Sequence, residues 1–396
     1  MSTPHDFDGI TIDRLREIGS YKWSTVPEAI GAFVAEMDFG VAPVIGEALV
    51  SAVHDGLTGY LPPHIAQRMA EACAHWHRER YGWDVAPERI KHVGDVLTGL
   101  RVTIDHYTAP GSAIVLPTPS YMPFLKIPPL HGREIIEVPM LLDDGRYTLD
   151  LDGIDRAFAA GGGLLILCNP FNPVGRVFER DELEAVAAVV ARHGGRVFSD
   201  EIHAPLVYAP HRHVPYASIG EVAAGHTITA TSASKSWNLP GLKTAQVILS
   251  NDADVETWAT PAVTRAEQSA STLGVIANTA AYERGGAWLD DTLGYLDGNR
   301  RLLADLLREH IPAMRYTPPE GTYIAWLDAR ELGIEGSPAD FFREHADVAL
   351  TDGAACGEAG EGFLRFILAT PRPVIEQAVR QMAEALARLD ERGRAA

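Results

Sequence analysis

Residues 231–243 read Thr231-Ser-Ala-Ser-Lys235-Ser-Trp-Asn-Leu-Pro-Gly-Leu-Lys243. Lys235 follows a turn rich in hydroxyl groups, and this turn follows a strand-like run that begins at Thr227. Such a turn offers hydroxyls and free backbone N–H groups to an anion, and a lysine beside it can condense with a bound aldehyde. Lys243 lies eight residues further on, past a Pro-Gly turn, and can return to the same anion. These features together indicate pyridoxal phosphate (PLP) as a cofactor.

Two segments upstream supply polar groups at the ends of predicted strands. One apolar run ends at Asn169-Pro-Phe-Asn172-Pro-Val-Gly175, and a second run, residues 196–199, ends at Asp200. Open α/β sheets bind ligands at the carboxyl ends of their strands. PLP needs an anionic partner for its pyridinium nitrogen, and an Asp is the expected group. Taken alone, Asp200 could also be a helix N-cap. Its position between the Asn172 loop and the Lys235 motif favours the cofactor role. Asn172 and His203 can hold the 3-oxygen of the ring.

In this order, the motifs resemble the fold-type I, class I/II aminotransferase superfamily, and are most similar to its cystathionine β-lyase-like C–S lyase branch. The segments that point to this branch are residues 35–39, 59–60, 117–121, 199–203, 321–328 and 362–365. They run in order along nearly the whole chain. His203, where many aminotransferases of the superfamily carry Tyr, favours the lyase branch.

The order of strand and helix patterns predicts an α/β fold. Strand candidates alternate with helical periods from residue 113 to residue 250, which indicates a mostly parallel sheet flanked by helices. The resemblance implies an aminotransferase-like fold of type I, with a seven-stranded sheet in a large domain and a smaller α+β domain. We expect residues 1–45 to join the small domain, residues 46–287 to form the large PLP-binding domain, and residues 288–396 to form the small domain.

A second anion site is predicted where Gly94-Asp-Val-Leu97 opens a helix, because the first N–H groups of a helix are free. We interpret Asp95 as the N-cap of this helix. The resemblance implies that Tyr60 reaches the phosphate in a neighbouring subunit, so that the enzyme is a homodimer. It also implies phosphate contacts from the amides of Val96 and Leu97 and from Ser232, Ser234 and Lys243.

The substrate's α-carboxylate requires a planar cation that can bind both oxygens. Arg365 is our first candidate because it lies in an apolar strand, where an unpaired guanidinium is costly. Arg372, at a helix start, is the second candidate. The resemblance implies that Tyr121 stacks on the pyridine ring and that the backbone around Ala35 and Glu36 lines the substrate pocket.

The resemblance implies a PLP-dependent C–S β-lyase that acts on cystathionine or another cysteine S-conjugate and releases a thiol, pyruvate and ammonia. Lys235 holds the cofactor and acts as base on the Cα proton, while Asp200 keeps the ring nitrogen protonated. The same residues serve transamination, so an aminotransferase is the alternative. A non-catalytic regulator that uses this fold is a third possibility, and the complete set of Lys235, Asp200 and Asn172 argues against it.

A few positions near the expected substrate entrance depart from the lyase pattern. Asp352-Gly353 stands where the family usually has Pro-Gly, and Ile367 stands where Asn is common. Because of these departures, the substrate could be an S-conjugate bulkier than cystathionine. Tyr323 and Trp326, on a predicted strand of the small domain, are interpreted as core residues.

Composition limits the other classes of function. The formal net charge of −19 argues against nucleic acid as a partner. The three cysteines form neither a metal spacing nor a disulfide framework, and we expect no metal and a cytoplasmic location. The first residues lack a signal-peptide pattern, and no window approaches the ~20 apolar residues of a membrane span, so no membrane partner is expected.

Overall fold

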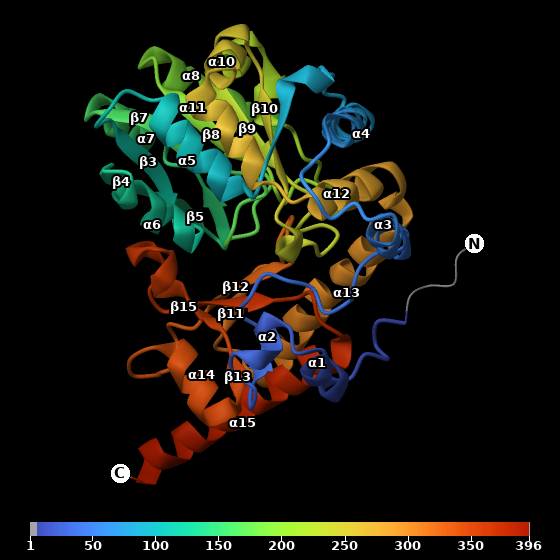
Figure 1. Cartoon of the computed structure of the whole chain (residues 1–396). Coiled ribbons are helices and arrows are strands. Elements are labelled where there is room, and N and C mark those ends of the chain that lie inside the picture. Colours follow the sequence, from blue (N-terminus) through green and yellow to red (C-terminus); the bar gives the residue numbers. More distant parts are fainter. Residues whose placement is uncertain (1–5, 396) are drawn as a thin grey trace.

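The structure, a computed structural model, describes residues 6–395. The first five residues, on which the expectations for the N-terminal segment and signal peptide partly fall, lie outside the described residues. Figure 1 shows the strands of the main sheet and their helices in the upper part of the view. The C-terminal strands and helices form the lower part, where α1 and α2 also lie.

Within the described residues, the main sheet has seven strands in the order β2-β10-β9-β8-β7-β3-β4. Strands β9, β8, β7, β3 and β4 are parallel to one another, and β10 is antiparallel to both β9 and β2. The predicted mostly parallel sheet is therefore confirmed. The strands are β2 (Ile90–Val93), β3 (Ala113–Thr118), β4 (Ile135–Pro139), β7 (Gly162–Cys168), β8 (Arg196–Asp200), β9 (Thr227–Thr231) and β10 (Ala245–Leu249).

The helices of this part cover the sheet, and β3 and β9 are buried along their full length. Helix α4 begins at a proline, Pro63, and ends before Gly82, whose left-handed φ of 67° suits glycine. The elements are α3 (Pro43–His54), α4 (Pro63–Tyr81), α5 (Val96–His106), α6 (Met122–Leu130), the hairpin β5 (Leu141–Asp143) and β6 (Arg146–Thr148), α7 (Leu151–Ala159), α8 (Arg180–Arg192), α9 (Glu221–His226), α10 (Asp252–Trp258), α11 (Pro261–Thr264) and α12 (Thr272–Arg284).

The long helix α13 (Gly286–His310) leads from α12 into the lower part of the molecule (Figure 1). There, a sheet has the order β11-β12-β15-β14, and β1 pairs in parallel with β13. The N-terminal segment therefore contacts the C-terminal part through this strand pair. The elements are α1 (Ile12–Ile18), α2 (Tyr21–Ser24), β1 (Ile30–Gly31), β11 (Arg315–Tyr316), β12 (Ile324–Asp328), α14 (Pro338–Ala346), β13 (Val348–Ala349), β14 (Thr351–Asp352), β15 (Phe363–Ile367) and α15 (Arg372–Ala395).

The sheet brings three functional segments together. Strands β7, β8 and β9 are adjacent and parallel, with Cys168 opposite Asp200 and Asp200 opposite Ala230. The loop after β7, the residues after β8 and the turn that carries Lys235 consequently leave the sheet at one edge. Among residues 6–395, no helix combines the length and the apolar character that a membrane span requires.

Candidate active site

Asp200 is the last residue of β8 and is almost completely buried, at 2% exposure. Its Oδ1 accepts a hydrogen bond of 3.1 Å from the backbone N–H of Ile202. Burial, with a smaller contribution from the neighbouring Glu201 carboxylate, raises the pKa of Asp200 to about 7. A cationic partner would favour its charged form, and the protonated nitrogen of a pyridine ring is such a partner.

Lys235 lies in the turn after β9, and its Nζ donates a hydrogen bond of 2.8 Å to the carbonyl oxygen of Ala35. The hydroxyl of Tyr323 donates to the same oxygen at 2.9 Å. Burial, followed by the nearby Arg365 guanidinium, lowers the pKa of Lys235 to about 8. The amine is thus close to the range in which it can both bond to an aldehyde and accept a proton at neutral pH.

The N-terminus of α5 forms one end of the pocket. Asp95 caps this helix as predicted, because its Oδ1 accepts a hydrogen bond of 2.8 Å from the N–H of Thr98. Lys243 lies 3.3 Å from the other Asp95 oxygen. Although burial acts in the opposite direction, the Thr98 hydrogen bonds and the Lys243 cation lower the pKa of Asp95. Val96, Leu97, Ser234 and Lys243 line the same pocket as Lys235.

Ser232 takes a different position from the other predicted phosphate ligands. It is 1% exposed, and its hydroxyl donates a hydrogen bond of 2.7 Å to the carbonyl oxygen of Thr244. The Ser232 hydroxyl oxygen in turn accepts a hydrogen bond of 3.0 Å from the N–H of Ser234. The Ser232 side chain therefore stabilises the turn through bonds within the protein and does not line the pocket, whereas Ser234 does.

The central part of the pocket is lined by Tyr121, Asn172 and His203 together with Asp200. His203 is 2% exposed, and its ring lies edge-on to Tyr323 with 6.0 Å between the centroids. Burial, with the cations Lys235 and Arg365, lowers the pKa of His203 to about 3, so the imidazole is neutral.

Arg365 projects from β15 and is 3% exposed. Its Nη2 donates to the carbonyl oxygen of Phe33 at 2.8 Å, and its Nη1 lies 3.4 Å from Asn172 Oδ1. Arg372, the second candidate anchor, pairs with Asp8 at 3.8 Å and lies over the ring of Tyr295. Only the first candidate contacts a residue of the pocket, so Arg365 is the better-placed carboxylate anchor.

Two predicted site residues turn away from this pocket. The Oε1 of Glu36 accepts the backbone N–H of Lys22 at 3.0 Å, and its carbonyl oxygen accepts the Lys22 amine at 3.3 Å, whereas Ala35 lines the pocket. Tyr60 is fully exposed, so it lies outside the pocket of its own chain.

Several residues around the site were not found from the sequence. Tyr323 and Trp326 both lie in the core as predicted, and the Tyr323 hydroxyl in addition donates a hydrogen bond to the Ala35 carbonyl, a contact that the sequence did not indicate. The buried ion pair of Lys22 with Asp38, at 2.8 Å, carries no local signal in the sequence. Glu201, which binds His213 at 3.0 Å, could have been suspected because it follows Asp200 directly.

The residues present fit PLP. Within residues 6–395, His203 Nδ1, in the pocket lining, and Arg365 Nε, in the residue that contacts Asn172, are buried atoms without a hydrogen-bond partner. The pocket also contains a helix N-terminus, two lysines and a buried carboxylate. PLP requires an anion site for its phosphate and a carboxylate for its ring nitrogen, and an amino acid substrate requires a guanidinium.

Comparisons with known proteins bear on the same site. A model of the family described as "Aminotransferase class I and II" matches residues 31–382. The chain belongs to this family. It is 38% identical over 380 residues to "Cystathionine beta-lyase" of Corynebacterium glutamicum, which covers 95% of this chain and 99% of that protein.

Solved structures agree with this assignment. Cystalysin from Treponema denticola, which contains a pyridoxal 5′-phosphate cofactor, matches with a TM-score of 0.91 and 29% identity over 98% of this chain and 100% of its own. The PLP-bound C–S lyase from Staphylococcus hominis matches with a TM-score of 0.88 and 28% identity over 97% and 99%. The chain is therefore a PLP-dependent enzyme of the C–S lyase branch, and the predicted fold type, cofactor and enzyme class are confirmed.

Proposed function

We propose that the enzyme carries out β-elimination on cystathionine or another cysteine S-conjugate. The observation that supports this most directly is the position of the Lys235 amine, with a pKa of about 8, in one pocket with the buried Asp200 carboxylate. The name of the Corynebacterium glutamicum relative supports cystathionine as the first substrate to test.

Each site residue has a proposed part in the reaction. When bound, PLP supplies an electron sink that stabilises negative charge on the substrate's Cα. The Lys235 amine accepts the Cα proton, and Asp200 holds a proton on the ring nitrogen. Arg365 binds the α-carboxylate, and Asn172 and His203 hold the 3-oxygen of the ring. The substrate then loses its thiol from Cβ, and the remaining product hydrolyses to pyruvate and ammonia.

The phosphate end of the pocket has its own proposed set of ligands. We propose that the amides of Val96 and Leu97, with Ser234 and Lys243, bind the phosphate, and that Tyr121 stacks on the ring. Ser232 stabilises the turn through its hydrogen bond to the carbonyl oxygen of Thr244. The nearness of these groups around the N-terminus of α5 supports this proposal.

The substrate side of the site differs from the lyase pattern at Asp352. Its Oδ1 accepts the N–H of Ala354 at 2.8 Å, and its other oxygen binds the Ser337 hydroxyl. Asp352 therefore fixes its own turn, and this supports a structural role for the departure.

We also propose that the enzyme is a homodimer in which Tyr60 reaches the phosphate of the neighbouring subunit. Full exposure of this large side chain supports the proposal. A cytoplasmic location is supported by Cys73, Cys168 and Cys356, which are free and buried.

The proposed reaction is tested by mixing PLP-loaded protein with excess L-cystathionine in the absence of a 2-oxo acid. We expect pyruvate to be released over many turnovers while the visible absorbance of the cofactor recovers. One equivalent of product with a lasting loss of that absorbance would instead identify an aminotransferase. The proposal would be refuted if pyruvate were released from none of the S-conjugates tested.

A further inference from the structure

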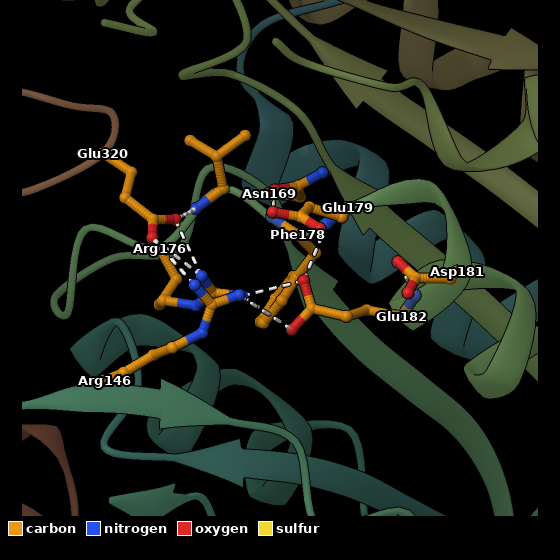
Figure 2. Close-up of polar contacts among 9 residues, drawn as sticks. Arg146, Asn169, Arg176, Phe178, Glu179, Asp181, Glu182 and Glu320 are labelled. Atoms are coloured by element: carbon orange, nitrogen blue, oxygen red, sulfur yellow. Dashed lines mark hydrogen bonds and ion pairs between the residues drawn. The ribbon is translucent and has the colours of Figure 1, made fainter. Parts of the chain in front are cut away.

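A buried arginine follows the loop that carries Asn172. Arg176 is 4% exposed and binds two carboxylates at once (Figure 2). Its Nη1 donates to both oxygens of Glu320, at 2.8 and 2.9 Å, and its Nη2 donates to both oxygens of Glu182, at 2.6 and 2.8 Å. Paired bonds of this kind are strong and directional, so they fix the relative positions of three segments.

The two carboxylates come from different parts of the molecule. Glu182 lies in α8, the helix that follows the loop, and its Oε2 also accepts the N–H of Glu179. Glu320 lies only four residues before β12. Its Oε2 accepts the N–H of Val177 at 2.8 Å, and its own N–H donates to the carbonyl oxygen of Gly175 at 2.8 Å. The Glu320 arm thus joins the Asn172 loop to the segment that enters the small sheet.

Both ends of this connection lead to the site. On one side, Asn172 lies 3.4 Å from Arg365. On the other side, Glu320 precedes Tyr323, which holds the Ala35 carbonyl that binds Lys235. Strand β12 also pairs with β15, with Trp326 opposite Arg365. A shift at Glu320 would therefore move the substrate-anchoring strands relative to the Asn172 loop.

A second arginine in the same view provides a contrast. Arg146, from β6, lies 3.8 Å from Glu320 and 3.9 Å from Glu182, and 49% of its side chain is exposed. It faces the same carboxylates without a hydrogen bond of ordinary length. Screening by water weakens such an exposed pair, so the positional constraint comes from Arg176.

We propose that Arg176 is a positioning residue, and that its bond to Glu320 sets the place of Asn172 relative to Arg365 when cofactor and substrate bind. This inference rests on the proposed roles of Asn172 and Arg365. Glu182 binds the same guanidinium, but it lies in α8, on the same side of the connection as Arg176 itself. Its bond therefore stabilises the fold without setting the distance between Asn172 and Arg365.

The test compares Glu320→Gln with Glu182→Gln, two isosteric changes on the two arms of one arginine. For each variant, KM, kcat and the pH midpoint of the bound cofactor's visible absorbance are measured, together with the thermal midpoint of unfolding. We expect Glu320→Gln to lower kcat/KM about tenfold or more, since small misplacements of reacting groups have large effects. It should also move the absorbance midpoint upward, because a weakened donor to the ring 3-oxygen disfavours the anionic form.

Glu182→Gln should lower the thermal midpoint and leave KM and the absorbance midpoint as in the wild type. Arg146→Ala is the charge control, and it should leave all four quantities unchanged. Arg176→Lys keeps the charge but cannot bind both carboxylates through a planar fork, so it should reproduce the Glu320→Gln profile. This variant replaces Glu320→Gln if the latter does not fold.

The proposal is overturned if Glu320→Gln and Arg176→Lys leave the absorbance midpoint and KM unchanged, or if Glu182→Gln moves them equally. Asn172→Ala separates this failure from failure of the site assignment. If Asn172→Ala moves the absorbance midpoint and Glu320→Gln does not, the positioning role fails alone. If Asn172→Ala also leaves it unchanged, the proposed role of Asn172 fails as well.

Discussion

Replacement of Arg365 by alanine tests the substrate anchor most directly. Its Nη2 is occupied by the Phe33 carbonyl, while Nε has no partner within the described residues and Nη1 has only the 3.4 Å contact to Asn172. Two donors are thus available to a carboxylate. A hydrogen bond to a charged group contributes about 1.5–3 kcal/mol. With part of this recovered by water, we expect a loss of about 3 kcal/mol, or roughly a hundredfold in KM.

The assay follows pyruvate release over a range of L-cystathionine concentrations, so that KM and kcat are obtained separately. We expect the main effect of Arg365→Ala to be on KM, because the carboxylate is bound before and during the reaction. Arg365→Lys should retain part of the binding, since an ammonium group supplies the charge without the planar fork. The thermal midpoint of each variant is compared with the wild type to detect unfolding.

Arg372→Ala is the matched control, because Arg372 was the other candidate in the sequence and it pairs with Asp8 instead of the site. It should leave KM unchanged. The reasoning is refuted if Arg365→Ala keeps the wild-type KM, or if Arg372→Ala raises KM by a similar factor.

Three further predictions address the cofactor site. Lys235→Ala should abolish turnover and the visible absorbance of the bound cofactor; retained activity would show that another residue is the base. Burial raises the pKa of Asp200 from 3.8 to about 7, so the cofactor-free fold holds a proton that the unfolded chain releases between those values. The free energy of unfolding of the cofactor-free protein, measured with urea, should therefore fall as pH rises from about 4 to 7. Asp200→Asn should make this free energy less dependent on pH. If the variant and the wild type show the same pH dependence, the raised pKa of Asp200 is contradicted. Tyr60→Ala and Lys235→Ala, each nearly inactive alone, should regain activity when unfolded and refolded together, and no gain would exclude sharing of the site between subunits.

Local signals explain why the main elements could be predicted. Helix α4 has such a signal at each end, because Pro62-Pro63 suits a helix start and Gly82 suits the position just after a helix end. Strand β2 (Ile90–Val93) was not predicted, because a four-residue edge strand with polar residues at its centre has no clear periodicity. Its place in the sheet depends on the antiparallel pairing with β10, which is a long-range contact.

The direction of side chains could not be predicted in the same way. Ser232 and Ser234 are equivalent in the motif, but only the backbone geometry of the turn decides that Ser232 bonds to Thr244. The bond of Arg176 to Glu320 joins residues 144 positions apart. The spacing of residues within a motif contains no information on contacts between residues so far apart in the sequence. The end of a strand, by contrast, can be predicted from the residues next to it. The sequence therefore predicted one site for Lys235 and Asp200, which line the same pocket, but it did not indicate the bond of Arg176 to Glu320.

The pKa of Lys235 connects substrate binding to the base. Burial lowers this pKa first, and the Arg365 cation lowers it next, while Asp200 and Glu36 raise it and Lys243 lowers it slightly. A carboxylate bound to Arg365 would cancel the second cause, so substrate binding should make the amine more basic. In the cofactor-free protein, Arg365→Ala imitates this cancellation and should raise the pKa of Lys235 above about 8. The pKa is obtained from the pH dependence of Lys235 acylation, followed by peptide mass spectrometry, with Arg372→Ala as control. An unchanged midpoint in Arg365→Ala would mean that the guanidinium does not act on the base.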